Sequence, residues 1–296
     1  MTRTRTGKRI ALTERDIEIF RVLARYRYLS SAYIYAFVGG ASETRFKERL
    51  GDLFHEGYID RPERQWEMAE CRHRPVIHEI GAGARRVLAK QGIIEEPRTW
   101  LRAASDRQFQ HSSMICEVMA SIEIGVRQRP GLRFISWPEI LAKAPIQTRS
   151  SAAPFRLRTG AAMPVIVPDG LFGLEYEVKN AKTYRFFAVE ADRGTMPVVR
   201  SDSSQTSCVG KLTAYRELLM TKGYKEHLGI PNLLVLMVTT QSHRLDEILE
   251  RFEDKEGRGE PFLFKAIEPS ELVSPTTKLL FDSWRRTSLP PLFIDH

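Results

Sequence analysis

The sequence has few cysteines, and their spacing indicates neither a disulfide framework nor a zinc site. Its three cysteines are Cys71, Cys116 and Cys208, and no two of them lie close together in sequence. Disulfide frameworks use even numbers of cysteines, and structural zinc sites use closely spaced pairs of Cys or His. The cysteines therefore favour a reducing compartment, and we expect the protein to be cytoplasmic.

Three further absences exclude classes of function. No apolar run approaches the roughly 18 residues of a membrane span, and the N-terminus lacks the apolar segment of a signal peptide. We therefore expect no membrane partner. The chain has no Gly-x-x-x-x-Gly-Lys phosphate loop, so no nucleotide cofactor is expected. It also lacks a three-His metal motif beside a tyrosine cluster, which disfavours a relaxase that nicks DNA through a covalent tyrosine.

Positive charge is in excess, and most of the excess lies in the first third of the chain. The 296 residues carry a formal net charge of +8. Residues 1–104 contain 20 Lys and Arg against 14 Asp and Glu, whereas the remainder is nearly neutral. A chain of this length favours two domains. A basic module joined to a neutral one indicates a polyanion-binding domain, although a solvated basic surface gives the same composition.

The first ninety residues have the pattern of three helices followed by a two-stranded ribbon. Residues 1–9, with Arg3, Arg5, Lys8 and Arg9, form a basic arm that we expect to be disordered alone. It could lie along phosphates or serve only as a solubilising tail. Capping residues and glycines then predict helices at 14–26, 30–37 and 42–56. Strands are predicted at 58–59 and 75–80, and a closing helix ends at 92.

This pattern is typical of a winged-helix domain, here residues 10–92. In that module the third helix enters the major groove and the tip of the ribbon contacts the DNA backbone. A polar helix face can also be merely solvated, but its position before an arginine-rich ribbon favours DNA contact. The expected partner is double-stranded DNA, and a homodimer on two half-sites remains open. The candidate DNA-binding residues are Thr44, Arg45, Lys47, Arg49, Arg61, Arg64, Arg72 and Arg74.

Residues 93–104 are expected to be a linker, residues 105–280 a second domain, and residues 281–296 an extended tail. The pattern of the second domain begins with a helix over 105–127 and continues with strands at 132–137, 165–175 and 184–191. Residues 141–163 are polar and basic, and we expect a loop there that is mobile or touches DNA. A Ser-rich loop, a helix to 220, a buried strand at 232–240, a charged helix at 243–254 and a strand at 261–267 follow.

Acidic residues occur where two of these strands end. Asp169 follows a short apolar run, and Glu190 and Asp192 point to the same face of one strand because side chains alternate along a strand. If the two strands pair, we expect three carboxylates to converge, and crowded carboxylates are commonly compensated by a hard cation. The expected cofactor is therefore Mg²⁺ or Mn²⁺, with Glu117 as a possible fourth ligand. Pro168-Asp169-Gly170 could equally be a plain turn.

The order helix, strand, strand, strand, helix, strand is similar to the core of the restriction-endonuclease-like PD-(D/E)xK nucleases. The fold class expected is therefore a winged-helix domain followed by a mixed α/β or α+β domain. Those nucleases have a Lys two residues after the second acidic residue, whereas this chain has Asp192 there. Lys211 could replace it from the following helix, where it shares a face with Tyr215. The resemblance implies the catalytic set Asp169, Glu190, Asp192, Lys211 and Tyr215.

Both halves together resemble the replication-relaxation family of plasmids and other mobile elements. The likeness lies in LTERD at 12–16, RYRYL at 25–29, HEIGAGA at 78–84, Pro168-Asp169 and VEADRGT at 189–195, followed by Lys211 and Tyr215. It covers roughly residues 10–267 and implies a DNA-binding protein tied to plasmid replication or DNA relaxation. Two alternatives stay open: a Mg²⁺- or Mn²⁺-dependent endonuclease that nicks or cuts DNA, and a winged-helix transcription regulator.

Overall fold

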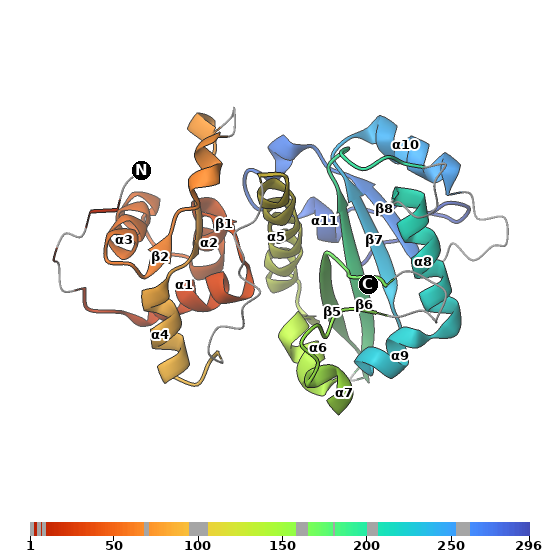
Figure 1. The fold of residues 1–296 in the computed structure, drawn as a ribbon, viewed down its shortest axis with the longest axis horizontal. Coiled ribbons are helices and arrows are strands. Elements are labelled where there is room, and N and C mark those ends of the chain that lie inside the picture. Colours follow the sequence, from red (N-terminus) through yellow and green to blue (C-terminus); the bar gives the residue numbers. More distant parts are fainter. Residues whose placement is uncertain are drawn as a thin grey trace. The chain divides into compact units, whose positions relative to one another are not determined.

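The computed structural model (Figure 1) divides the chain into two compact units, residues 1–124 with 270–276 and residues 125–269 with 277–296. The described residues are 3–4, 7, 10–67, 71–94, 106–157, 165–179, 181–199, 207–252 and 261–296. The boundary between the units falls inside helix α5 (Asp106–Arg127). Most of the expected linker at 93–104 lies outside the described residues, and the predicted domain limits stay a prediction.

The first unit contains the three helices that the sequence predicts. Thr13 accepts a hydrogen bond from the backbone of Asp16 and the Asp16 side chain bonds back, so a capping box begins the first helix. Ser42 caps the third helix by accepting from the Arg45 N–H, and Gly39, at φ 64°, ends the second. The helices are α1 (Glu14–Arg25), α2 (Ser31–Val38), α3 (Glu43–His55) and α4 (Ala82–Lys90).

The strands of this unit form a small antiparallel sheet with one more strand than the ribbon predicted from sequence. The strands are β1 (Leu29–Ser30), β2 (Ile59–Asp60) and β3 (Ile77–Ile80), in the order β1-β3-β2. The first strand escaped prediction because two residues are too few to show an alternating pattern. Between β2 and β3 the chain forms two 3-10 turns, η1 (Glu63–Glu67) and η2 (Cys71–His73).

Two side chains hold the outer segments of this unit in place. Gln65 is buried, and it bonds both the N–H (2.8 Å) and the carbonyl (3.0 Å) of Ile77, so it fixes the connection between β2 and β3. Arg3 donates to the Phe54 carbonyl (2.9 Å) and the Ile59 carbonyl (3.0 Å) and lies over the Phe54 ring. Part of the arm expected to be disordered is therefore docked. Arg5, Lys8 and Arg9 lie outside the described residues.

The second unit is built on a five-stranded mixed sheet. Its strands β4 (Leu132–Ile135), β5 (Gly170–Val178), β6 (Ala181–Asp192), β7 (Leu234–Thr239) and β8 (Phe262–Ala266) lie in that order. The first three are antiparallel, and β6, β7 and β8 are parallel. Parallel neighbours need crossover connections, and these run through helices α8 (Cys208–Thr221), α9 (Gly223–Leu228) and α10 (Ser242–Arg251).

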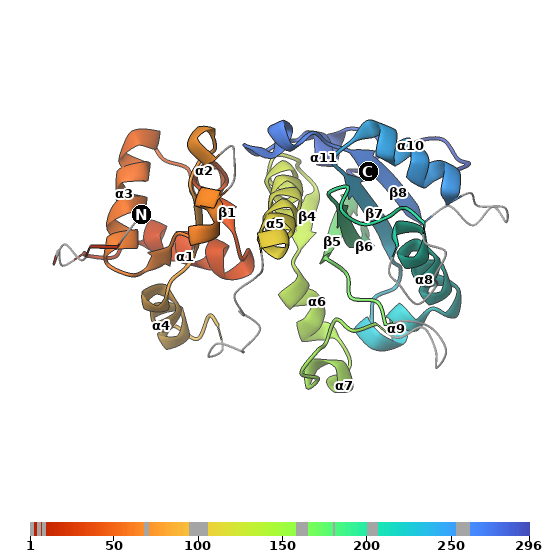
Figure 2. The same ribbon diagram turned by 45° about the horizontal axis from the view of Figure 1, so that its top comes forward.

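Helices α8 and α10 lie on the same side of this sheet (Figure 2). Apolar side chains of both helices, among them Leu212, Leu218 and Ile248, form one buried cluster with residues of β5 to β8. Tyr215 is completely buried in this cluster, and Ser207 caps α8 by accepting from the Gly210 N–H at 3.1 Å. The face of α8 that carries Lys211 and Tyr215 is thereby directed at the sheet.

Two segments of this unit differ from the prediction. The loop expected over 141–163 contains the end of α6 (Trp137–Lys143) and all of α7 (Ile146–Arg149), because a capping box of Ser136 and Glu139 begins α6. Residues 158–163 lie outside the described residues. The strand expected at 165–175 begins only at Gly170 and extends to Val178. The expected strand and helix at 232–240 and 243–254 are confirmed as β7 and α10.

The tail after residue 280 is part of the fold rather than merely extended. A short helix, α11 (Lys278–Phe281), precedes it, and Arg285 pairs with Phe264 on the outer edge of β8. Trp284 and Ile294 are fully buried. The tail therefore covers one edge of the sheet. In the described part of the chain, helices fall short of the combined length and apolarity that a bilayer crossing needs.

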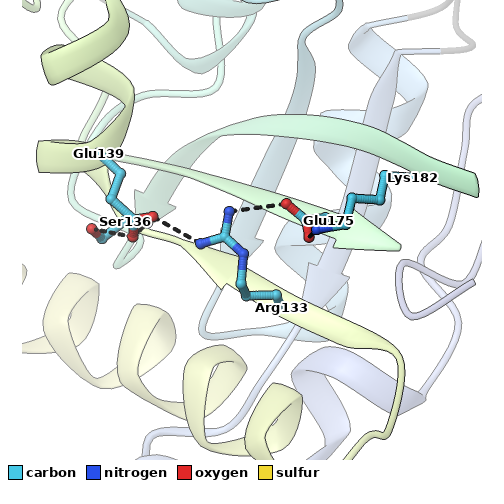
Figure 3. Close-up of polar contacts among 5 residues, drawn as sticks. All are labelled: Arg133, Ser136, Glu139, Glu175 and Lys182. Atoms are coloured by element: carbon cyan, nitrogen blue, oxygen red, sulfur yellow. Dashed lines mark hydrogen bonds and ion pairs between the residues drawn. The ribbon is translucent and has the colours of Figure 1, made fainter. Parts of the chain in front are cut away.

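A polar network joins β4, β5, β6 and α6 near the hairpin between β5 and β6 (Figure 3). The Arg133 guanidinium donates to Glu139 (2.8 Å) and to Glu175 (3.0 Å), and Lys182 donates to Glu175 at 2.7 Å. Hydrogen bonds from Lys182 and then Arg133 lower the pKa of Glu175. Glu139 also accepts from Ser136, so the same carboxylate that begins α6 anchors this helix to the sheet.

Candidate functional site

Asp169 and Glu190 come together because β5 and β6 are paired. Gly170 lies opposite Val189 in the antiparallel register, which brings the residue before β5 beside the end of β6. The Asp169 carboxylate accepts a hydrogen bond from the Ala191 N–H at 3.0 Å. Glu190 lies on the face of β6 that α8 covers. The sequence pattern of the two strands is therefore sufficient to predict this pair.

Helix α8 places a lysine and a tyrosine against these carboxylates. The Lys211 ammonium bonds Glu190 Oε2 and lies 3.7 Å from Asp169 Oδ1. The Tyr215 hydroxyl donates to Glu190 Oε1 at 2.5 Å. We call Asp169, Glu190, Lys211 and Tyr215 the carboxylate–lysine cluster. Contacts made by Lys211 and Glu190 thus connect four of the five residues in the predicted catalytic set.

Burial controls the charge of this cluster. The Glu190 side chain is only 3% exposed. Burial, and then the neighbouring charge of Asp169, raise the pKa of Glu190, and the charge of Lys211 and the hydrogen bonds from Lys211 and Tyr215 oppose this rise. Burial by itself would lower the pKa of Lys211, but the charges of Glu190 and Asp169 outweigh it and raise that pKa. Burial also raises the pKa of Tyr215, followed by the charge of Glu190. Lys211 therefore stays a cation near neutral pH.

Asp192, the fifth member of the predicted set, belongs to a different interaction. Its carboxylate forms an ion pair with Arg244 of α10, in which Arg244 Nη2 lies 3.1 Å from Asp192 Oδ1. It also accepts from the Gly194 N–H at 3.1 Å and from the Thr239 hydroxyl at 3.5 Å. The Arg244 guanidinium continues to the Met196 carbonyl. The expected convergence of three carboxylates is thus a convergence of two.

Within the ranges that the structure describes, no group of three His, Cys, Asp or Glu side chains is arranged to hold a metal ion. Metal binding by Asp169, Glu190 and Asp192 stays a prediction. Glu117, the suggested extra ligand, is a buried residue of α5 in the first unit, where the Ser113 hydroxyl lies 3.3 Å from its carboxylate. Burial raises the pKa of Glu117 to about 7, although the charge of Arg74 opposes the shift.

Sequence reasoning missed Arg244, which links four segments of the second unit. Besides Asp192 and Met196, its guanidinium reaches Cys208 Sγ at 3.6 Å, at the first residue of α8. Arg244 lies 52 positions after Asp192 in the sequence. It is on a charged helix whose pattern does not indicate which arginine would bind a carboxylate. A search for the nearest buried cation to each predicted carboxylate would find it, but such a search needs the fold.

The candidate DNA-binding residues of α3 divide into two groups. Thr44, Arg45 and Lys47 are exposed, and Lys47 pairs with Glu43 one turn earlier at 2.8 Å. Arg49 differs, because its guanidinium binds the buried Asp16 carboxylate at 2.6 and 3.0 Å. Asp16 also belongs to the capping box of α1. Arg49 therefore joins α1 to α3, and this structural role accounts for its charge.

The arginines between β2 and β3 also differ in exposure. Arg72 is exposed, whereas Arg64 and Arg74 are half-buried. Arg61 lies over the Phe54 ring at 4.4 Å from its centroid, and burial lowers its pKa. The exposed candidates of the first unit are thus Thr44, Arg45, Lys47 and Arg72.

A comparison with models of known protein families gives one informative match. The model described as replication-relaxation matches residues 20–233, which is more than half of the chain. The chain belongs to the replication-relaxation family. Searches among curated proteins and among solved structures found no match. The replication-relaxation match includes α3, the segment between β2 and β3, and the whole carboxylate–lysine cluster. It ends just before β7, earlier than the resemblance noted from sequence.

Proposed function

We propose that the first unit binds double-stranded DNA as a winged helix and that the protein acts in the replication of a plasmid or other mobile element. The observation that supports this most directly is the order of α1, β1, α2, α3, β2 and β3 with the sheet order β1-β3-β2. In such a module the third helix enters the major groove. Here α3 carries exposed Thr44, Arg45 and Lys47 near its N-terminus, and Arg72 is exposed between β2 and β3.

The test is the affinity for duplex DNA as a function of salt, measured by fluorescence anisotropy. The plot of log K against log salt has a negative slope, and each lost phosphate contact makes that slope shallower by about 0.9. The double variant Arg45→Ala/Lys47→Ala should bind at least tenfold more weakly, since a good base contact contributes about 1–3 kcal/mol. The control Arg86→Ala/Lys90→Ala removes two exposed cations of α4. Equal binding by both variants would contradict the proposal.

A second function, hydrolysis of a DNA phosphodiester, is favoured by the position of Lys211. PD-(D/E)xK nucleases carry the lysine on the strand, and in this chain the lysine of α8 lies beside both carboxylates. The donor set fits Mg²⁺ or Mn²⁺, because these ions are commonly held by one or two carboxylates together with substrate phosphates. Asp169 and Glu190 would hold the ion, which would polarise the phosphoryl group for attack by water.

The protein groups would have distinct tasks in this reaction. Lys211 keeps a positive charge beside the carboxylates, where it can stabilise negative charge that develops on the phosphoryl oxygens. Tyr215 donates to Glu190 and fixes the orientation of that carboxylate, which leaves its other oxygen toward Lys211. Asp192 has no direct task, because Arg244 binds it. Its role is to hold the end of β6.

Incubation with supercoiled plasmid in Mg²⁺, Mn²⁺ or EDTA tests this function. Glu190→Gln and Lys211→Met should abolish open-circular and linear products, whereas Arg286→Met, at a half-buried residue of the C-terminal tail, should not. Intact plasmid under every condition, with retarded bands at low salt, would leave a DNA-binding protein whose second unit serves as a scaffold. A cytoplasmic location and a homodimer stay predictions.

A further inference from the structure

One segment of the second unit contains basic residues and no acidic ones. From Ile140 to Pro168 the sequence has no Asp or Glu, but it contains Lys143, Arg149, Arg156 and Arg158. Arg158 lies outside the described residues. The other three side chains are exposed. This segment is the longest stretch of the sequence without an acidic residue.

Helix α9 lies against this segment and adds two more cations. The Thr148 hydroxyl donates to the His227 carbonyl at 2.5 Å, and the His227 ring lies 2.7 Å from the Pro154 carbonyl. Both views draw α6, α7 and α9 at the same end of the sheet (Figures 1 and 2). Lys222 and Lys225 at the start of α9 are exposed. We call Lys143, Arg149, Arg156, Lys222 and Lys225 the α7–α9 cationic surface.

These five cations lack the carboxylate partners that several other cations of the second unit have. Among the described residues, none of the five side chains has an ion-pair partner. By contrast Arg133 and Lys182 share Glu175 (Figure 3), and Lys211 and Arg244 are bound to carboxylates. Glu226 is the exposed acidic residue of α9. Unpaired charges of one sign repel one another, and a polyanion removes that repulsion.

We propose that the α7–α9 cationic surface binds the phosphates of duplex DNA, as a second contact separate from α3. The exposed side-chain amide of Gln147 is a further donor to phosphate. A lipid surface fits less well, because interfacial binding needs an apolar face and Ile146 is the large apolar side chain exposed on α7. The choice of DNA rests on the proposed function of the first unit.

This surface is connected by the chain to the carboxylate–lysine cluster. Leu157 pairs with Ile166 in an antiparallel bridge, and Asp169 follows three residues later. DNA held by Arg149 and Lys225 would therefore lie on the same unit that carries Asp169 and Glu190. The surface gives that unit its own affinity for the substrate that the cluster would act on.

The experiment compares two double variants of the full chain that each lose two exposed cations of the second unit. Arg149→Gln/Lys225→Gln removes one cation from α7 and one from α9, and Lys179→Gln/Arg251→Gln removes isolated cations from the β5–β6 turn and α10. Affinity for a fluorescein-labelled duplex is measured between about 50 and 200 mM salt. The first variant should make the negative slope of log K against log salt shallower by about 2, and the second variant should leave this slope unchanged.

An unchanged slope for Arg149→Gln/Lys225→Gln, or an equal fall for both variants, would overturn the proposal. Weaker binding to phosphatidylglycerol vesicles with an unchanged DNA slope would assign the surface to lipid and would also overturn it. The variant Arg45→Ala/Lys47→Ala separates the two proposals. If Arg45→Ala/Lys47→Ala binds DNA normally while Arg149→Gln/Lys225→Gln shows a shallower salt dependence, the winged-helix proposal fails and the proposal for the α7–α9 cationic surface stands. Circular dichroism spectra that match the wild type exclude unfolding of either variant.

Discussion

Replacing Arg244 with Met should strongly destabilise the second unit. The Arg244 and Asp192 side chains are 11% and 5% exposed. Removing one partner of a buried ion pair costs roughly 3–5 kcal/mol, because the other charge stays buried without compensation. Asp192 would keep the Gly194 N–H and the distant Thr239 hydroxyl. We therefore expect Arg244→Met to lower the free energy of unfolding by about 3–5 kcal/mol.

Arg285→Met is the matched control, since it breaks a pair with Asp246 whose side chains are 52% and 56% exposed. Exposed pairs contribute at most about 1 kcal/mol. Urea unfolding followed by tryptophan fluorescence gives both free energies from the midpoint and the slope. Equal losses in the two variants would refute the argument from burial. The double variant Asp192→Leu/Arg244→Met should be more stable than Arg244→Met, because it leaves no charge buried.

Arg244→Met should also reduce any cleavage that depends on Lys211. The segment that Arg244 binds is attached to the start of α8, where the Cys208 and Val209 N–H groups bond the carbonyls of Pro197 (3.1 Å) and Val198 (3.0 Å). Loosening that segment would move the first turn of α8, which carries Lys211. A variant that loses stability but cleaves at the wild-type rate at low temperature would show that Arg244 does not position Lys211.

Three further predictions concern the first unit. Arg49→Met should lower its stability by about 2–3 kcal/mol through the loss of the pair with buried Asp16, whereas Arg45→Met should change it by less than about 0.5 kcal/mol in the same urea titration. Burial, and then the charge of Arg61, lower the pKa of His78 to about 3. Between this pKa and the ordinary value of about 6.5, the unfolded chain binds a proton at His78 that the folded chain does not. The free energy of unfolding should therefore fall by about 1.4 kcal/mol for each unit that the pH drops below about 6.5. Urea unfolding at pH 7 and pH 5 should show that His78→Leu removes this fall. Burial raises the pKa of Glu117 to about 7. As the pH rises above the pKa of the unfolded carboxyl, the unfolded chain loses this proton more readily than the folded chain, so Glu117 lowers the free energy of unfolding. Glu117→Gln should raise the free energy of unfolding at pH 8 by about 1–3 kcal/mol and leave it unchanged near pH 4.5.

Local signals in the sequence were sufficient for most of the elements. Thr13 and Ser42 cap helices that begin where expected, and Gly39 ends a helix at a positive φ that few other residues adopt. The alternation along β6 correctly directs Glu190 at α8, and the spacing of four between Lys211 and Tyr215 places both on one face. Each of these inferences depends on residues within one turn or one strand of each other.

The sequence does not reveal contacts between residues far apart in the chain. The pattern of α3 marks Arg49 as a surface cation but does not show that it binds Asp16, 33 residues earlier. Strand alternation gives the direction of Asp192 but not its ion pair with Arg244. The missed helix α6 is a different case. Its Ser136 and Glu139 form a readable capping box, which the basic composition of the following residues obscured.

The position of Lys211 bears on why β6 can carry an aspartate two residues after Glu190. Glu190 is nearly buried, and a buried carboxylate needs a cation or a proton close by. With Lys211 supplied by α8, a second lysine at position 192 would add a buried charge without a partner. An aspartate there, bound to Arg244, instead ties β6 to α10 and to the segment that begins α8. The two acidic residues of β6 therefore have different roles. Glu190 binds Lys211, and Asp192, through Arg244, holds the start of the helix that carries Lys211.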